Sequence, residues 1–323
     1  MSSPDISKFQ NKRILVVGDI MLDEFLYTTS TRLSPEYKDA PVYDVQEKKS
    51  YLGGAANVAL NIKNLQAIPY LAGVIGNDAN GKKICELLNK ADITQDYLYT
   101  NSERKTTTKT RILKDDKPVL RIDEEITGDL PQLPSNFLLK KIRQCISDHK
   151  PHAILIQDYN KGVLNAFSIQ QILAIAKENH IPVCVDPKFK NWELYQEVDL
   201  FKPNKKELEV MRAELNVESD NLAEIAKILQ EKIHFKNLLV TLGSEGNFIF
   251  NSTGPKTLHL KSQISNPDVC GAGDTVMATA TLGVVCGFSL KEIAELSNRA
   301  GSAVCQKKNV QPVTFEELLS TKY

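Results

Sequence analysis

The chain has 323 residues, of which 42% are hydrophobic, so it can bury one large core or two modest ones. Forty basic residues balance forty acidic ones, which gives no reason to expect nucleic acid or an anionic membrane surface as the main partner. Six scattered cysteines, and the lack of a signal-peptide pattern or a bilayer-spanning apolar stretch in the printed residues, predict a cytoplasmic protein.

Short β-branched segments alternate with helical patterns along most of the chain. Strand alternating with helix predicts an α/β fold, with a mostly parallel sheet covered on both faces and ligands bound beyond the carboxyl ends of the strands. The expected strands cover 14–17, 70–75, 153–156, 182–185 and 238–240, and the expected helices cover 55–65, 82–90, 168–178 and 222–232.

Two segments with extended polar and apolar character interrupt this alternation, at about 25–46 and 106–123. The second turns at residues 114–117, Lys-Asp-Asp-Lys. Inserted into an α/β unit, the two segments predict a small β lid over the site, and the alternative is a pair of ordinary surface hairpins. No repeat or linker divides the chain, so we expect one domain over 1–323 that carries this lid.

The first polar motifs lie near the amino terminus. Asp19 and Asp23 follow the first strand, and Gly53, Gly54 and Asn57 stand where a helix begins. Carboxylates and an amide offer the acceptors and donors that sugar hydroxyls need, while two glycines admit a ligand close to the backbone. Each motif alone is also typical of ordinary turns, so it is the combination that indicates a sugar site.

The middle of the chain contains one misleading motif and several charged residues after strands. Residues 76–83 approach the Walker A pattern, but Lys83 stands where a Mg²⁺-binding Ser or Thr belongs, so we interpret them as a loop leading into a helix. Asp158, Lys161 and Lys188 follow strand ends. The lysines are candidates for neutralising phosphate charge, although lysines in loops are more commonly exposed.

A polar pair and a glycine turn follow. Asn204 and Glu207 have the spacing of a capping box, and the functional alternative is support of Mg²⁺ through water. Thr241, Gly243 and Gly246 follow the strand at 238–240. A hydroxyl and two glycines would accommodate the phosphates or ribose of a nucleotide, and a simple strand-to-hairpin turn explains them equally well.

The most informative segment is 268–275, Asp-Val-Cys-Gly-Ala-Gly-Asp-Thr, just before an apolar helical pattern. Small residues at 271–273 let the backbone approach a ligand, and the free N–H groups of a first helical turn point at an anion. Asp274 would lie beside that anion as acceptor for a hydroxyl proton, which indicates phosphoryl transfer to an alcohol. The alternative is a helix start with an acid that favours the macrodipole.

Taken together and in this order, the motifs resemble the ribokinase or PfkB family of sugar kinases over nearly the whole chain. The resemblance implies a ribokinase-like three-layer fold with a β lid, with ATP and Mg²⁺ as cofactors. It implies Asp274 as base, with Gly271, Ala272 and Gly273 around the transferred phosphoryl group. The sugar residues it implies are Asp19, Asp23, Gly53, Gly54, Asn57, Arg121, Asp158 and Lys161, and the nucleotide residues are Lys188, Asn204, Glu207, Thr241, Gly243, Gly246 and Asn298.

The same resemblance implies Mg²⁺ held by Glu207 through water, a monovalent cation such as K⁺ near Asp268, and a homodimer. Within the family, the sequence motifs are most similar to those of the heptose 7-phosphate kinases that feed ADP-heptose synthesis for lipopolysaccharide. The phrases that carry this likeness are 17–23, 32–36, 53–59, 120–123 and 158–162. A sugar phosphate as acceptor would account for basic residues such as Arg111 and Arg121 near the lid.

Three segments depart from the subfamily pattern: 37–39, Cys270 and 306–309. Kinases of another sugar or sugar phosphate, such as a fructose phosphate or ribose, therefore stay open, as does a non-catalytic sensor that kept the pocket. An oxidoreductase is disfavoured because no Gly-x-Gly-x-x-Gly follows the first strand. The printed residues hold no His-x-Gly-His motif, so we expect a separate adenylyltransferase for the pathway.

Overall fold

The computed structural model describes residues 4–258 and 267–320, and its centre is a nine-stranded sheet. The order is β13-β12-β11-β10-β9-β8-β1-β4-β5. Seven strands are parallel, and only β12 and β13 at one edge run antiparallel to their neighbours. The bounds are β1 Arg13–Gly18, β4 Ile68–Gly76, β5 Leu98–Asn101, β8 Ala153–Gln157, β9 Val183–Asp186, β10 Leu200–Phe201, β11 Asn237–Thr241, β12 Asn247–Phe250 and β13 Lys256–Leu258. The expected mostly parallel sheet is confirmed.

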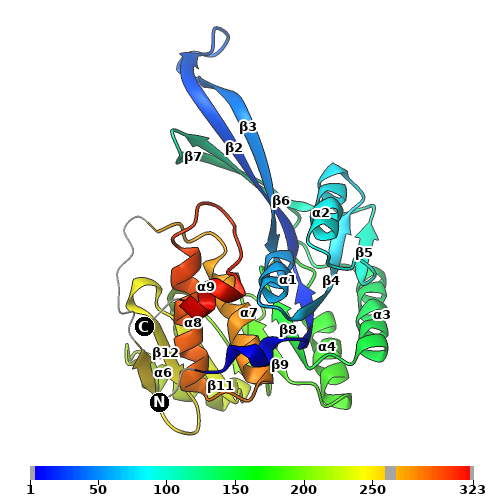
Figure 1. Cartoon of the computed structure of the whole chain (residues 1–323), viewed down its shortest axis with the longest axis vertical. Coiled ribbons are helices and arrows are strands. Elements are labelled where there is room, and N and C mark those ends of the chain that lie inside the picture. Colours follow the sequence, from blue (N-terminus) through cyan, green and yellow to red (C-terminus); the bar gives the residue numbers. More distant parts are fainter. Residues whose placement is uncertain (1–3, 259–266, 321–323) are drawn as a thin grey trace.

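Helices cover both faces of this sheet, because side chains of each strand alternate between two cores. Ile14 and Val16 of β1 pack in one core, and Leu15 and Val17 pack in the other. The first core contains α1 Ala55–Asn64, α2 Ala79–Lys90, α7 Ala272–Val285, α8 Leu290–Val304 and α9 Phe315–Ser320. The second contains α3 Gln132–His149, α4 Ala166–Glu178, α5 Lys205–Glu214 and α6 Leu222–Ile233. The result is a three-layer α/β fold (Figure 1).

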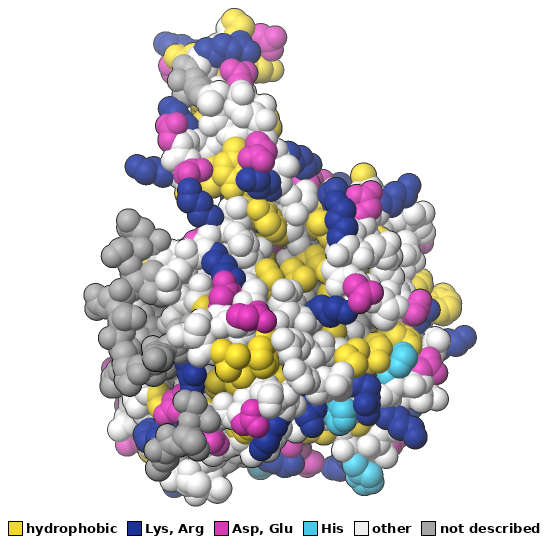
Figure 2. Space-filling model, viewed as in Figure 1, with side chains coloured by type: hydrophobic (Ala, Val, Ile, Leu, Met, Phe, Trp, Pro, Cys, Tyr) yellow, Lys and Arg dark blue, Asp and Glu magenta, His cyan; other side chains and the backbone are white. Residues whose placement is uncertain are grey.

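A second, four-stranded sheet projects from this body (Figure 1). Its order is β3-β2-β6-β7, with bounds β2 Ile20–Leu33, β3 Pro41–Gly54, β6 Thr107–Lys114 and β7 Lys117–Glu124. We call this sheet the lid. Charged and hydrophobic side chains are mixed on the face of the lid that Figure 2 shows.

The first lid hairpin is longer than the sequence pattern predicts. It spans 20–54 rather than 25–46, because β2 follows β1 after the single residue Asp19 and β3 runs directly into α1 at Gly54. The predicted turn at 114–117 is present, and its central residues Asp115 and Asp116 have φ of 49° and 62°. Two left-handed residues suit the twist of a tight hairpin, and Asp tolerates that conformation.

The segment that resembles a Walker A loop leads into α2. Asp78 caps this helix, because its side chain accepts a hydrogen bond from the backbone N–H of Gly81. Within residues 4–258 and 267–320, no helix combines the length and the apolar character needed to cross a membrane.

Candidate active site

Asp274 lies in the first turn of α7, at the edge of the sheet where the parallel strands end. Its side chain is only 3% exposed. One carboxylate oxygen, Oδ2, accepts a hydrogen bond of 2.8 Å from Asn57 Nδ2. Asn57 itself lies in the first turn of α1, directly after the glycine pair. The late helix start and the early diglycine motif therefore meet at Asp274.

The other oxygen, Oδ1, faces the end of β8. It accepts hydrogen bonds from the Tyr159 hydroxyl at 2.7 Å and from Gln157 Nε2 at 3.3 Å. Burial raises the pKa of Asp274 to about 6, against the lowering effect of the bonds from Asn57 and Tyr159. Asp274 is thus a carboxylate that is ionised at neutral pH, and it is more basic than an exposed aspartate.

Backbone N–H groups beside Asp274 are open to a ligand. Gly271 caps α7 with φ of 76°, and a Cβ there would lie 2.7 Å from Asn57 Nδ2, so glycine is required. Gly273 is exposed, and a Cβ at this position would meet no atom within 4 Å. Ala272 stands between them, and its N–H donates to the Val269 carbonyl at 3.2 Å, so the amides left for a ligand are those of the two glycines. This opening suits a phosphate group.

The predicted sugar residues lie around the same point. Gly53 has Asp23 beside it, because a Cβ on Gly53 would fall 2.3 Å from Asp23 Oδ2. Gly54, with φ of 57°, caps α1 and lies against the Asp19 carbonyl. Asp23 also accepts a hydrogen bond of 2.6 Å from Arg111 of the lid. Asp23 therefore joins the lid to the mouth of α1.

Asp19 and Asp158 lie deeper, each only 1% exposed. Asp19 Oδ2 accepts hydrogen bonds from the backbone N–H groups of Tyr159 and Lys161, so it holds the loop after β8 in place. Burial, reinforced by Asp158, raises the pKa of Asp19 to about 6. Asp158 accepts hydrogen bonds from Tyr195 and Asn191. These two predicted sugar residues lie beneath the loop that presents Tyr159.

The predicted nucleotide residues gather at the ends of β9, β10 and β11. Asn204 and Glu207 form a complete capping box at the start of α5. Glu207 also pairs with Lys188, and Asn204 makes a parallel bridge with Thr241. Burial alone would lower the pKa of Lys188, but Glu207 and Asp186 raise it. The Asn204–Glu207 pair is therefore a capping box, as one interpretation predicted, and its pairing with Lys188 also fits the other interpretation, support of Mg²⁺ through water.

Comparison with known proteins decides the family. Residues 11–317 match the pfkB family of carbohydrate kinases. The chain belongs to the PfkB family. It is therefore a carbohydrate kinase, a phosphotransferase with an alcohol group as acceptor.

Among curated relatives, proteins named "Bifunctional protein HldE" are similar to this chain. The one from Helicobacter pylori strain Shi470 is 36% identical over 312 residues, which cover 95% of this chain and 65% of the relative. The one from Hydrogenovibrio crunogenus is 35% identical over 311 residues, covering 96% of this chain and 62% of the relative. The chain thus spans somewhat less than two thirds of the length of these relatives.

Solved structures share the fold. Arabidopsis thaliana ribokinase, complexed with ribose and ATP, superposes with a TM-score of 0.73 at 21% identity, covering 97% of this chain and 99% of that one. Escherichia coli phosphofructokinase-2, in complex with potassium, gives 0.75 at 19% identity, covering 97% and 98%. The expected ribokinase-like fold is confirmed.

Other predicted residues of this PfkB kinase have contacts that do not reach Asp274. Gly243 is exposed and Gly246 is buried, with φ of 63° and 101°, so both glycines serve the turn after β11. Asn298 of α8 donates a hydrogen bond of 3.3 Å to the Leu258 carbonyl at the end of β13. Asp268 accepts hydrogen bonds from the backbone N–H groups of Cys270 and Asn309. Asp268 therefore ties the turn before α7 to the segment after α8.

Sequence reasoning missed a buried polar chain that supports the kinase site. Gln157 donates to Asp186 Oδ2 at 3.0 Å as well as to Asp274, and Asp186 pairs with the buried Lys202 at 3.1 Å. Gln157 and Asp186 are the last residues of β8 and β9. Their position at the carboxyl ends of predicted strands is the signal that would have identified them.

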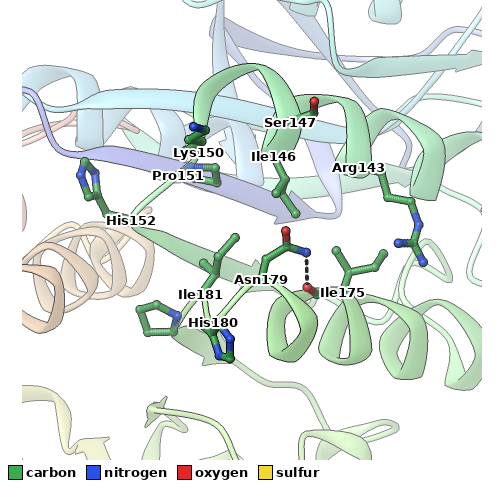
Figure 3. Close-up of a pocket in the computed structure, with 11 residues that line it drawn as sticks. Arg143, Ile146, Ser147, Lys150, Pro151, His152, Ile175, Asn179, His180 and Ile181 are labelled. Atoms are coloured by element: carbon green, nitrogen blue, oxygen red, sulfur yellow. Dashed lines mark hydrogen bonds between the residues drawn. The ribbon is translucent and has the colours of Figure 1, made fainter.

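A surface pocket lies at the other end of the strands, where β8 and β9 begin. It is lined by Arg143, Ile146, Ser147, Lys150, Pro151, His152, Ile175, Asn179, His180, Ile181 and Pro182. Figure 3 shows it between the ends of α3 and α4 and the beginnings of β8 and β9. Because Asp274 meets β8 at its other end, this pocket is separate from the kinase site.

Proposed function

We propose that this kinase transfers the γ-phosphoryl group of ATP to the anomeric hydroxyl of D-glycero-D-manno-heptose 7-phosphate, giving the 1,7-bisphosphate for ADP-heptose and lipopolysaccharide core synthesis. The observation that carries the proposal is the 2.8 Å bond between Asn57 and Asp274. This bond supports the proposal because it joins the early diglycine segment to a buried carboxylate of raised pKa, next to the exposed Gly273.

Asp274 would accept the proton of the attacking hydroxyl. With a pKa of about 6 the side chain is ionised at neutral pH, and its basicity lies close to the working pH, where a general base is most effective. The amides of Gly271 and Gly273 would donate to the phosphoryl oxygens, where negative charge develops, while the Ala272 amide bonds the Val269 carbonyl. Asn57 and Tyr159 hold the carboxylate in position for the hydroxyl.

Mg²⁺ bound to ATP would neutralise phosphate charge. The donor set near Lys188 fits an ion held chiefly by nucleotide and water. One Glu207 oxygen accepts from the Asn204 backbone N–H, and the other pairs with Lys188, so Glu207 is suited to contact through water. No group of three or more His, Cys, Asp or Glu residues in the described chain could enclose a metal ion.

The identity of the acceptor rests on the HldE relatives and on the heptose-kinase phrases in the sequence. Kinases of fructose phosphates or ribose share the fold, and the solved neighbours include both ribokinase and phosphofructokinase-2. A non-catalytic sensor is disfavoured because Asp274 and both glycines keep a reactive geometry.

A panel of acceptors with ADP detection tests the proposal. Heptose 7-phosphate, fructose 6-phosphate, fructose and ribose are each offered with ATP and Mg²⁺. We expect the highest kcat/KM with the heptose phosphate and a 1,7-bisphosphate product by phosphorus NMR. A higher kcat/KM for another sugar would replace the acceptor, and tight ATP binding without turnover of any acceptor would support the sensor.

Three further features belong to the proposal. We propose a homodimer formed through the lid, a K⁺ ion near Asp268 that stimulates turnover, and a cytoplasmic location with a separate adenylyltransferase in the pathway. All six cysteines are free thiols, as expected in a reducing compartment. Activity measured with K⁺ replaced by tetramethylammonium tests the ion, and unchanged turnover would remove it.

A further inference from the structure

One face of the lid carries charged residues in matched rows. Asp23 of β2, Lys109 of β6 and Asp123 of β7 are direct partners across the strands. Two residues further on, Phe25, Arg111 and Arg121 form the next row. Residues opposite one another, and those two apart on one strand, share a face of the sheet. Since Asp23 touches the Gly53 position, this face looks onto the starts of α1 and α7.

Most charges on this face are paired. Arg111 pairs with Asp23 at 2.6 Å and Arg121 pairs with Asp123 at 2.5 Å. Lys161, from the loop after β8, pairs with Glu125 at 2.7 Å. These three cations each form an ion pair, and Lys109 lies between Asp23 and Asp123 across the strands without an ion pair to either of them.

Lys109 forms no ion pair with any carboxylate in the described part of the chain. Its ammonium lies 5.0 Å from the centre of the Tyr159 ring. Burial lowers the pKa of Lys109, and the neighbouring charges of Lys161 and Arg121 add to this, whereas the charges of Asp23 and Asp123 act against it. A half-buried ammonium without a counter-ion is unfavourable unless an anion arrives. The Lys109 ammonium is therefore available to pair with an incoming anion beside Tyr159.

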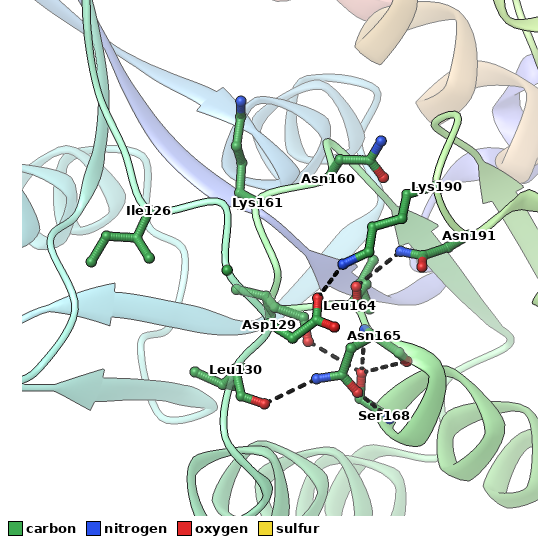
Figure 4. Close-up of polar contacts among 12 residues, drawn as sticks. Ile126, Asp129, Leu130, Asn160, Lys161, Leu164, Asn165, Ser168, Lys190 and Asn191 are labelled. Carbon is green, nitrogen blue, oxygen red and sulfur yellow. Dashed lines mark hydrogen bonds and ion pairs between the residues drawn. The ribbon is translucent and has the colours of Figure 1, made fainter.

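Lys161 points toward the same region. Figure 4 shows that Lys190 turns to Asp129, whereas the Lys161 side chain extends away from that cluster. Lys161 is only partly exposed, as is its partner Glu125. An ammonium has three N–H donors, so Lys161 can bind an incoming phosphate while it keeps its ion pair with Glu125. The same phosphate can form an ion pair with Lys109.

We propose that Lys109, assisted by Lys161 and Arg121, binds the phosphate of a phosphorylated sugar acceptor. This inference rests on the proposed function, and it names the group that selects a sugar phosphate over a free sugar. Tyr159 contacts both residues, because Lys109 lies over the Tyr159 ring and the Tyr159 hydroxyl donates to Asp274. An acceptor lying along Tyr159 would therefore reach Lys109 at one end and Asp274 at the other. The phosphate thus binds at Lys109 while the reacting hydroxyl lies at Asp274.

The test compares acceptors with and without phosphate. In Lys109→Met we expect the KM for heptose 7-phosphate to rise roughly ten- to hundredfold, because a hydrogen bond to a charged group is lost. The KM for ATP and the kcat/KM for the unphosphorylated heptose should stay within about twofold of wild type. Lys109→Arg should recover part of the loss. Lys114→Met, on the opposite face of the same strand, is the matched control.

Several outcomes overturn the inference. They are an increased KM for ATP instead of the acceptor, equal losses with both acceptors, or no change at all. Thermal unfolding with and without ATP shows whether the variant is folded. If wild type phosphorylates none of the sugars, the proposed function fails, but binding still tests Lys109. A sugar phosphate should then raise the Tm of wild type, compete with inorganic phosphate, and leave Lys109→Met unaffected.

Discussion

Asp274 is held by neutral donors rather than by a cation. Asn57, Gln157 and Tyr159 orient its two oxygens, and no Lys or Arg of the described chain pairs with it. A cation in contact would lower the pKa and weaken the base, whereas neutral donors fix the geometry and leave burial to raise the pKa to about 6. The arrangement suits Asp274 to the role of general base that we propose for it near neutral pH.

Replacing Asp274 with Asn separates catalysis from folding. We expect kcat to fall by about a hundred- to ten-thousandfold, because no group remains to accept the proton. Ionising the buried carboxylate costs roughly 1–3 kcal/mol of folding free energy above pH 6. Removing that charge should offset the poorer contact with Asn57, so Tm at pH 7.5 should not fall. ATP binding should stay nearly intact. Steady-state kinetics, calorimetry and ATP titration measure kcat, Tm and ATP affinity, respectively. Retained turnover would exclude Asp274 as the base.

Tyr159→Phe should move the pH profile of the enzyme. The base works only when Asp274 is ionised, so kcat/KM should decline as pH falls below about 6. The hydroxyl of Tyr159 lowers that pKa, and its loss should shift the acid limb to higher pH. Tyr99→Phe, on the edge strand β5, is the control. An unchanged acid limb in Tyr159→Phe would show that the hydrogen bond does not tune the base.

Two helices, α1 and α7, begin beside the hydrogen bond between Asn57 and Asp274. α1 and α7 each start at a glycine with positive φ, Gly54 and Gly271, and each presents a polar residue in its first turn. The two glycines of the late turn have different surroundings. Gly271 has Asn57 against it, whereas Gly273 faces open space. The first glycine is therefore needed by the fold, and we propose that the second leaves space for the phosphate.

Alanine at these two positions should reduce activity in both cases but should affect stability differently. Gly271→Ala places a Cβ in left-handed backbone and against Asn57, so we expect a loss of about 1–3 kcal/mol in unfolding free energy together with activity. Gly273→Ala should leave Tm unchanged or raise it, because alanine favours a helix, yet turnover should fall as the methyl group enters the phosphate space. Denaturant unfolding and kinetics compare them. Full activity in Gly273→Ala would place the phosphate elsewhere.

Sequence reasoning predicted the elements whose signal is local. The helix starts at Asn57 and Asp274 follow from glycines before an apolar pattern, and the strands follow from β-branched segments. It did not find the chain from Gln157 to Lys202, because that contact depends on β8, β9 and β10 being neighbours in the sheet. It also did not single out Lys109, which we propose to be important because it forms no ion pair with a carboxylate in the described part of the chain. Order in a sheet and missing partners are not local properties of a sequence.

At the scale of the whole molecule, the lid has two unlike faces. The face toward the body carries paired charges, and Asn309 donates hydrogen bonds to the hydroxyls of Tyr27 and Tyr51. The outer face places Leu120 and Ile122 of the edge strand β7 in solvent, 51% and 48% exposed. An exposed, apolar edge strand is suited to a second copy of the chain.

Charges on that outer face should disrupt the proposed homodimer. We expect wild type to elute as a dimer at micromolar concentration and Leu120→Glu/Ile122→Glu to elute as a monomer, because the apolar contact is lost and like charges face each other. Light scattering after size exclusion gives the mass. Leu133→Glu, an equally apolar and 67% exposed site on α3, is the control. A monomeric wild type would contradict the proposal.

The bond between Asn57 and Asp274 joins positions that are 217 residues apart. On the ribosome, α1 emerges long before α7 is synthesised. A nascent chain can therefore form the diglycine half of the site but lacks the carboxylate that we propose accepts the proton of the attacking hydroxyl. We therefore expect no phosphoryl transfer before α7 has left the ribosome and packed against α1.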